Sequence, residues 1–488
     1  MDHAAATLLA FPPEDGPTSN EQYDKTIHQY LKRVNRLFEE KTSVVATHAV
    51  QLLELLTPAT HSVAYLVILD VLINQTGQAG LPSDELVDHI LRFLLTFDPR
   101  QIRYCGSSFS TLLNRVGNGL VFPHSIAVDV LAKALLRLDP TGSILTSHHI
   151  ALTKLAYQTD NIEPAFKVIE KSIVYYPGMS KKQEPKYLSD MTLPPPSYIS
   201  KETGLTTNLQ VTQVLEYDLL CGMMYCSAKQ WEKASAAFER VLSYPTRDQG
   251  VSKIMVEAHN KWILVNLLLS GRTPSLPAYT SPAARRHYET LGKPYTMIGS
   301  HFDSLDAAAL KIEAEQNLQR WQDDGNFGLM REVLAAHQQW QIINLRDVYS
   351  KISISDIRAR TRSAETGESL EIDEEVEVLI NNMIASGMLE GTIEKPGGSP
   401  AYLKFLQSSN ELTEDEFSAE LLVTAQKIKD LQPVLKATNE RLSTSKEYVR
   451  HLIKEQKREK ENAGRDAAIG FDAQIEDEDL MGGLLPGQ

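Results

Sequence analysis

At 488 residues, the chain is long enough to form two or three domains, each with its own buried core. Its formal net charge of −14 argues against a general nucleic-acid binder, which needs a basic face to neutralise phosphates. Three cysteines are too few for a disulfide framework, and no run of about 18 apolar residues occurs, so we expect a soluble intracellular protein without a membrane span.

Residues 1–20 are predicted to form a flexible leader. Asp2 stands where an export signal would carry a lysine or arginine, and the short apolar stretch 4–11 runs into Pro12 and Pro13. This pattern favours a loose leader over a signal peptide.

Residues 21–300 are predicted to form an array of helical repeats. Apolar residues recur at helical spacing in segments 44–56, 85–95, 126–138 and 254–269, while strand-like alternation is nearly absent. Such helices must bury their apolar stripes against one another, so the fold class is mainly α.

Three segments of this array resemble repeat units that each end in a proline. They span 124–140, 150–177 and 217–245, and their final prolines are spaced near one and then two periods of the ~34-residue tetratricopeptide repeat. In 217–245, Gly222 and Ala234 are expected to let two helices approach closely. Tyr225 and Phe238 would fill the space between neighbouring helix pairs.

A polar, proline-rich segment at 178–210 interrupts the array. We interpret it as a surface loop inserted between helices. The alternative is that its run of Pro194, Pro195 and Pro196 is a recognition motif for a proline-reading domain.

Residues 339–407 are predicted to form a winged helix. Two helices, at 304–323 and 327–337, come before it. The pattern then predicts a helix at 340–350, a short strand around Ser353 and a helix capped by Ser355. A helix over 372–386, ended by Gly387, and a hairpin of 388–394 with 400–405 complete the module.

The third helix of this module is too acidic to read DNA. It opens with Glu371, Asp373, Glu374 and Glu375, whereas DNA-reading helices present basic and amide side chains. The arginines of the preceding helix, at 358, 360 and 362, could contact phosphate, form a solvated face or pair with the acidic helix. We therefore predict a protein-docking module that binds no nucleic acid.

Residues 411–465 are predicted to form helices that join a larger bundle. A capping box at Thr413 and Glu416 opens a 4–3 apolar spacing, weakened by Thr424, Thr438 and Ser445. Pro433 should kink or break it, leaving either one bent helix or two helices. The predicted seam is Phe417, Leu421, Ile428, Leu431, Leu435, Leu442, Val449 and Leu452. Residues 466–488 form an acidic tail, which we expect to be disordered.

A helical-repeat array that runs into a winged helix resembles the PCI-domain family, here over 210–407. PCI subunits occur in the proteasome lid, the COP-nine signalosome and a translation initiation factor. Segments 252–272 and 321–334, with Asp324, Asn326, Gly328 and Leu329, most closely resemble the third-subunit family of the signalosome.

This resemblance implies a hetero-oligomeric scaffold in the cytoplasm and nucleus. It would bind other PCI subunits and isopeptidase subunits directly. Through the complex it would also contact cullin-RING ubiquitin ligases, from whose cullins the complex removes a ubiquitin-like modifier. The alternatives are a PCI scaffold of the proteasome lid or of the initiation factor. PCI winged helices associate edge to edge, so we expect a docking edge formed by Leu389, Thr392, Ile393, Ala401, Leu403 and Phe405.

The sequence offers no catalytic constellation. It lacks a phosphate-binding loop, an HExxH helix and a nucleophile elbow, and the adjacent His148 and His149 would point in different directions. Cys221 and Cys226 are spaced so that they do not converge on a metal. We therefore expect no enzyme activity and no catalytic, metal-binding or cofactor-binding residues.

Overall fold

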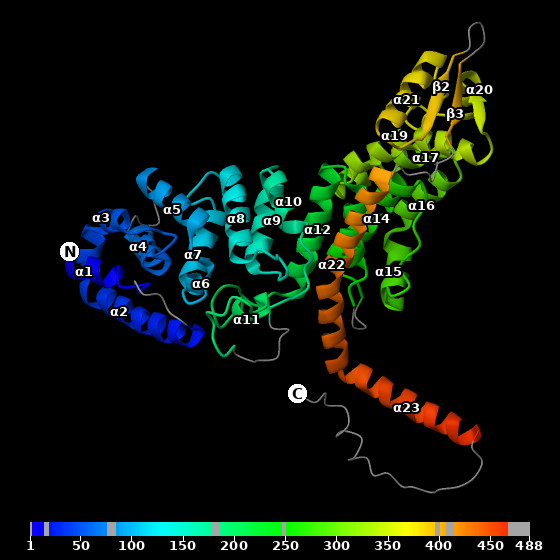
Figure 1. Cartoon of the computed structure of the whole chain (residues 1–488). Coiled ribbons are helices and arrows are strands. Elements are labelled where there is room, and N and C mark those ends of the chain that lie inside the picture. The colour runs from blue at the N-terminus through cyan, green and yellow to red at the C-terminus, as the bar shows by residue number, and fades with distance from the viewer. Residues whose placement is uncertain are drawn as a thin grey trace. The chain divides into compact units, whose positions relative to one another are not determined.

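The computed structural model describes residues 2–13, 19–75, 84–177, 185–245, 250–395, 401–406 and 414–466 (Figure 1). The chain divides into two units, residues 1–417 and 418–488. The described residues are mainly helical, and their three short strands belong to one sheet. The predicted fold class, a helical-repeat array followed by a winged helix and C-terminal helices, is confirmed.

The first part of the array is built from helices that pack on one another. Its helices are α1 (Asp2–Leu8), α2 (Asn20–Thr47), α3 (Ala49–Leu55), α4 (Ser62–Gln75), α5 (Asp84–Thr96), α6 (Pro99–Ile102), α7 (Gly106–Gly117), α8 (His124–Leu138), α9 (Ser147–Gln158) and α10 (Glu163–Ile169). The helices predicted at 85–95 and 126–138 match α5 and α8, whereas the one predicted over 44–56 is divided at His48 between α2 and α3.

The N-terminal residues are part of this packing. The sequence predicts a flexible leader over 1–20, but residues 2–8 form α1, and Leu8 and Phe11 are buried. The Tyr30 hydroxyl of α2 donates to the Leu8 carbonyl at 2.8 Å, and the Phe11 ring stacks on that of Tyr30. The prediction is wrong for 2–13 because the apolar residues around Pro12 cover α2; residues 14–18 lie outside the described part.

The segment predicted as a surface loop at 178–210 is also packed, from residue 185 onward. Pro195 and Pro196 begin the short helix α11 (Pro195–Tyr198), where a missing N–H costs nothing. Pro195, Tyr198 and Ile199 are buried. The alternative of an exposed proline-recognition motif is therefore wrong, and residues 178–184 lie outside the described part.

The second part of the array contains the tetratricopeptide-like pair. Its helices are α12 (Val211–Ser227), α13 (Trp231–Leu242), α14 (Lys253–Ser270), α15 (Pro282–Leu291) and α16 (Lys293–Asp303). A Cβ on Gly222 would lie 2.5 Å from the Phe238 ring, so the absence of a side chain lets α12 approach α13. The Tyr225 ring stacks on Phe166 of α10 at 5.6 Å. The close approach at Gly222 and the place of Tyr225 between helix pairs are as expected, whereas the Phe238 ring lies within the α12–α13 pair rather than between pairs.

Helix α14 (Lys253–Ser270) matches the prediction at 254–269, but the helices that follow differ from their predicted bounds. The long helix predicted over 304–323 is divided at Asn317 into α17 (Ala307–Gln316) and α18 (Leu318–Asp323). The two helices predicted at 327–337 and 340–350 are instead one, α19 (Phe327–Asn344), which is followed by a 3-10 turn (Leu345–Asp347).

The winged helix has the predicted order of elements. Beyond the end of α19 it consists of β1 (Lys351–Ser353), α20 (Ile354–Arg360), α21 (Asp373–Ala385), β2 (Gly391–Glu394) and β3 (Tyr402–Phe405). Ser353, not Ser355, caps α20, because its hydroxyl accepts from the Asp356 N–H. Gly387 has the predicted left-handed backbone, with φ of 73°. The strands order as β1-β3-β2, all antiparallel.

Two helices follow the winged helix in the sequence, α22 (Glu414–Thr444) and α23 (Lys446–Asp466). The sequence left open one bent helix or two, and placed the break at Pro433. Pro433 instead lies inside α22, and the break is at Ser445, whose hydroxyl accepts from the Tyr448 N–H at 3.2 Å. Thr413 and the tail after Asp466 lie outside the described residues.

Candidate protein interface

A buried polar cluster lies at the start of α19, the helix whose far end belongs to the core of the winged helix. Lys261 of α14 and Asn326, the residue before α19, are almost inaccessible to solvent. The Lys261 ammonium donates to the Asn326 side-chain oxygen at 2.6 Å, and the Asn326 amide donates to the Tyr295 hydroxyl at 2.6 Å. That hydroxyl donates to the Asp324 carboxylate at 2.7 Å. The cluster therefore joins α14, α16 and the turn before α19.

Sequence reasoning named Asp324 and Asn326 but missed their partners Lys261 and Tyr295. The sequence carries only a weak signal for Lys261, because it follows the polar residues His259 and Asn260, although a lysine buried within a helix must find partners. Of the other two residues of that motif, Gly328 has open space around its Cβ position, and Leu329 packs at the margin of the array core.

Basic side chains of the winged helix pair with its acidic helix. The Arg358 guanidinium contacts the Asp373 carboxylate at 2.9 Å and donates to the Glu371 carbonyl at 2.7 Å. The Lys395 ammonium contacts Glu377 at 2.5 Å. Of the three roles left open for the arginines, pairing with the acidic helix is the one that Arg358 adopts.

The residues predicted to form a docking edge fall into three groups by burial. Leu389, Leu403 and Phe405 are buried in the core of the winged helix, together with Ile357 and Ile380. Ile393 and Ala401 are half-buried at the margin of that core, and Thr392 is exposed. Leu403 and Phe405 cannot form an edge, because β3 is the central strand of the sheet. That part of the prediction is wrong.

The outer strand β2 does offer backbone groups. Leu406 donates from its N–H to the Glu390 carbonyl at 3.1 Å, and β2 pairs with β3 in the register Thr392 with Lys404 and Ile393 with Leu403. Hydrogen-bonded and non-bonded pairs alternate along an antiparallel ladder, so the N–H and C=O of Ile393 point away from β3. Sequence reasoning could not find this, because strand order decides which groups are outermost.

The predicted seam lies mostly on the surface of this chain. Its residues on α22 are exposed, at 56% for Phe417, 59% for Leu421, 56% for Ile428, 61% for Leu431, 62% for Leu435 and 44% for Leu442. Val449 and Leu452 lie beyond the Ser445 break, on α23, and are half-buried. The seam is therefore divided between two helices, and its α22 part presents six large apolar side chains at heptad-like spacing.

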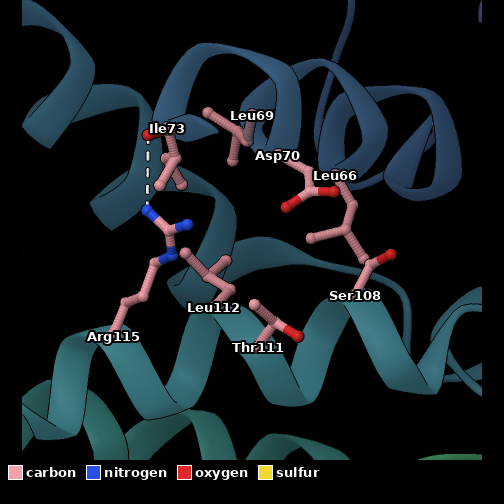
Figure 2. A pocket seen from close by; sticks show the side chains of 8 residues that line it. All are labelled: Leu66, Leu69, Asp70, Ile73, Ser108, Thr111, Leu112 and Arg115. Carbon is pink, nitrogen blue, oxygen red and sulfur yellow. Dashed lines mark hydrogen bonds between the residues drawn. The ribbon is translucent and has the colours of Figure 1, made fainter. Parts of the chain in front are cut away.

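A shallow groove in the first part of the array has no catalytic constellation in its lining. Figure 2 shows this groove between α4 and α7, lined by Leu66, Leu69, Asp70, Ile73, Ser108, Thr111, Leu112 and Arg115. The Arg115 guanidinium donates to the Ile73 carbonyl at 3.3 Å. The hydroxyls of Ser108 and Thr111 have no histidine beside them in the groove lining to act as a base.

The histidine pair is structural. The His148 ring bonds to the Ser110 hydroxyl at 3.1 Å, and the His149 ring bonds to the Thr146 hydroxyl at 2.8 Å. Burial lowers the pKa of His148 to about 4 and that of His149 to about 3, so both are neutral near pH 7. In the described part of the chain, no group of three or more histidine, cysteine, aspartate or glutamate side chains could hold a metal ion.

Comparison with known proteins identifies the family. The chain matches the family model for the N-terminal helical repeats of COP9 signalosome complex subunit 3 over residues 23–191 and 195–284. It is 45% identical over 499 aligned positions to COP9 signalosome complex subunit 3 of Neurospora crassa, with 99% of each chain covered.

The chain belongs to the COP9 signalosome complex subunit 3 family.

A second member of this family, from Emericella nidulans, is 31% identical over 452 aligned positions, which cover 88% of this chain and 89% of that protein. The resemblance noted in the sequence, to third subunits of the signalosome, is thereby confirmed. The family model ends at residue 284, before the winged helix begins, and the aligned relatives extend the likeness over nearly the whole chain. No helix in the described ranges is long and apolar enough to cross a membrane.

Proposed function

We propose that the chain is a non-catalytic scaffold subunit of the COP9 signalosome, present in the cytoplasm and the nucleus. In this role it supports removal of a ubiquitin-like modifier from cullin-RING ubiquitin ligases, a reaction performed by an isopeptidase subunit of the complex. Its partners are other PCI subunits and the isopeptidase subunits. The observation that carries the proposal is the exposed apolar seam of α22 in a chain of this family.

The seam supports assembly for a physical reason. Six large apolar side chains on one helix, each more than two-fifths exposed, form a surface that partner helices would bury. Burying a Leu or Ile side chain contributes about 1.5–3 kcal/mol, so even part of this seam would stabilise a complex strongly. The polar Thr424 and Thr438 make a self-sufficient coiled coil unfavourable and favour a bundle of several subunits.

The seam is tested by replacing Leu431 and Leu435 together with glutamine, which preserves helix propensity. The matched control replaces the exposed Lys427 and Lys436 of the same helix with glutamine. Each full-length variant is co-expressed with the other signalosome subunits, and native mass spectrometry measures how much of it enters the complex. We expect the amount of the leucine variant in the complex to fall at least tenfold, whereas the control variant should assemble normally. Normal assembly of the leucine variant would contradict a role for the seam.

The outer edge of β2 is a second proposed contact, formed by backbone pairing with another winged helix. Ile393→Pro removes an outward N–H without removing a bond to β3, because proline is tolerated where the N–H faces solvent. Ile393→Val is the matched control, since it keeps the N–H and most of the packing. We expect only the proline variant to lose its contact with the neighbouring PCI subunit in the same assembly measurement. Circular dichroism checks that both variants are folded. Equal assembly of both would exclude edge pairing at β2.

A further inference from the structure

Residues 185–206 make more specific contacts than a connecting loop requires. This segment, called the strap below, includes α11 and lies between α10 and α12 in the sequence. In space it returns to α2 and then passes α6, α7 and α9 in turn (Figure 1). It thus contacts helices that are separated from it by up to about 170 residues in the chain.

The first part of the strap is bonded to α2. The Asp24 carboxylate accepts from the backbone N–H groups of Leu188 at 3.0 Å and Ser189 at 3.2 Å. The Ser189 hydroxyl, which is fully buried, donates to the Asn20 carbonyl at 3.1 Å. The Tyr187 hydroxyl donates to Glu21 at 3.2 Å. Carboxylate acceptors for backbone N–H groups are among the stronger hydrogen bonds in proteins.

Two arginines, one in α6 and one directly after it, donate hydrogen bonds to the same stretch of the strap. Arg103 is only 3% exposed, and its guanidinium donates to the carbonyls of Leu188 at 3.0 Å and Asp190 at 2.6 Å. That guanidinium also lies 3.7 Å from the centre of the Tyr198 ring in α11. Arg100 donates to the Ser189 carbonyl at 2.9 Å and to the Asn20 side chain of α2 at 2.9 Å.

The last part of the strap is fitted against α7 and α9. A Cβ on Gly106 would lie 2.2 Å from the Thr203 carbonyl oxygen, so the strap requires a glycine at the start of α7. The Ser110 hydroxyl of α7 donates to the Gly204 carbonyl at 2.6 Å. The Ser147 N–H, at the start of α9, donates to the Thr206 hydroxyl at 3.2 Å.

We propose that the strap couples α2, α6, α7 and α9 into one cooperative unit. In a repeat array each helix pair contacts only its neighbours, so the terminal pairs can open without the rest. The strap adds contacts that skip over neighbours, because one segment bonds to α2, α6, α7 and α9. Opening of α2 therefore requires release of the strap, and release of the strap exposes Arg103, Ser189 and Tyr198 together.

The test is hydrogen exchange of the full chain with Arg103→Ala. Arg103 donates to the strap and to no group of α2, whereas Arg100 and Tyr104, which contact α2 directly, are left in place. We expect amide exchange to become at least tenfold faster both in the strap and in α2, with no change in α12–α14. Arg137→Ala is the matched control. Like Arg103, Arg137 donates to two backbone carbonyls, those of Thr96 and Phe97, and lies over an aromatic ring, that of Phe97. These groups belong to the end of α5 and not to the strap. It should affect α5 and α8 alone.

Two results would overturn the proposal. One is faster exchange in the strap with α2 unchanged, which would mean that the strap only rests on the array. The other is unchanged exchange in both. If Arg103→Ala prevents folding, the milder Asp24→Asn probes the coupling from α2, and it should loosen the strap and α6 as well as α2. Protection of the strap equal to that of the unmodified chain in Asp24→Asn would likewise contradict the proposal.

Discussion

The buried polar cluster before the winged helix depends on the side chain of Asn326. It accepts from the Lys261 ammonium and donates to the Tyr295 hydroxyl, both at 2.6 Å. Asn326→Ala leaves a buried ammonium without one of its acceptors, and a hydrogen bond to a charged group contributes about 1.5–3 kcal/mol. We expect the free energy of unfolding to fall by about 2 kcal/mol in urea denaturation.

The control for this substitution is Asn317→Ala. Asn317 bonds to Glu313 within its own surface turn, so its loss should cost about 0.5 kcal/mol or less. Equal losses for the two variants would show that the buried cluster is not a special source of stability.

Buried histidines make the stability of the array depend on pH. Burial lowers the pKa of His148, His259 and His337 to about 4 each, from the value of 6.5 expected in the unfolded chain. Between these values the unfolded chain binds more protons than the folded one, so folding is penalised increasingly as the pH falls from about 6.5 towards 4. We expect the Tm to fall steeply over this window.

The His259→Phe variant isolates one contribution to this pH dependence. The His259 ring stacks on Tyr288 at 4.4 Å with nearly parallel planes, so a phenyl ring fits the same site without titrating. Thermal melts at pH 7 and pH 5 should show a smaller difference for the variant than for the unmodified chain. An unchanged difference would exclude His259 as a source of the pH dependence.

At the scale of elements, the sequence predicts the interiors of helices and their close contacts well, but it predicts the positions of helix ends poorly. The apolar periodicity of 254–269 gave α14 because no competing pattern occurs there. His48 and Asn317 end helices without a glycine or proline, so no local signal marked those breaks. Pro433 predicts a kink or a break, yet the helix continues through it as α22, and the break falls at the capping residue Ser445.

The contact between α12 and α13 is tested by a pair of glycine substitutions. Gly222→Ala would place a methyl group 2.5 Å from the Phe238 ring, and such overpacking typically costs about 1–3 kcal/mol. Gly328→Ala, also within a helix but with no atom within 4 Å of the new Cβ, should be neutral or slightly stabilising. The comparison is made by urea denaturation. Equal effects of the two substitutions would mean that Gly222 is not required for helix packing.

At the scale of the whole molecule, the order of the domains could be predicted, but the long-range contacts could not. The winged helix followed from the alternation of helices and hairpin in 339–407, and the exposed seam followed from the 4–3 spacing after residue 413. The packing of Phe11 on α2, the strap, and the central place of β3 depend on groups distant in sequence. No local pattern encodes such contacts, so the sequence predicts an edge position for Leu403, whereas the structure has it in the central strand.

The central claim is that this chain is a signalosome scaffold. It is tested most directly by purifying the tagged full-length chain from its own cells and identifying the companions present in stoichiometric amounts by mass spectrometry. The account predicts other PCI subunits together with an isopeptidase subunit, and cullins in smaller amounts. Recovery of the proteasome's ATPase subunits, with neither the isopeptidase subunit nor cullins, would contradict it.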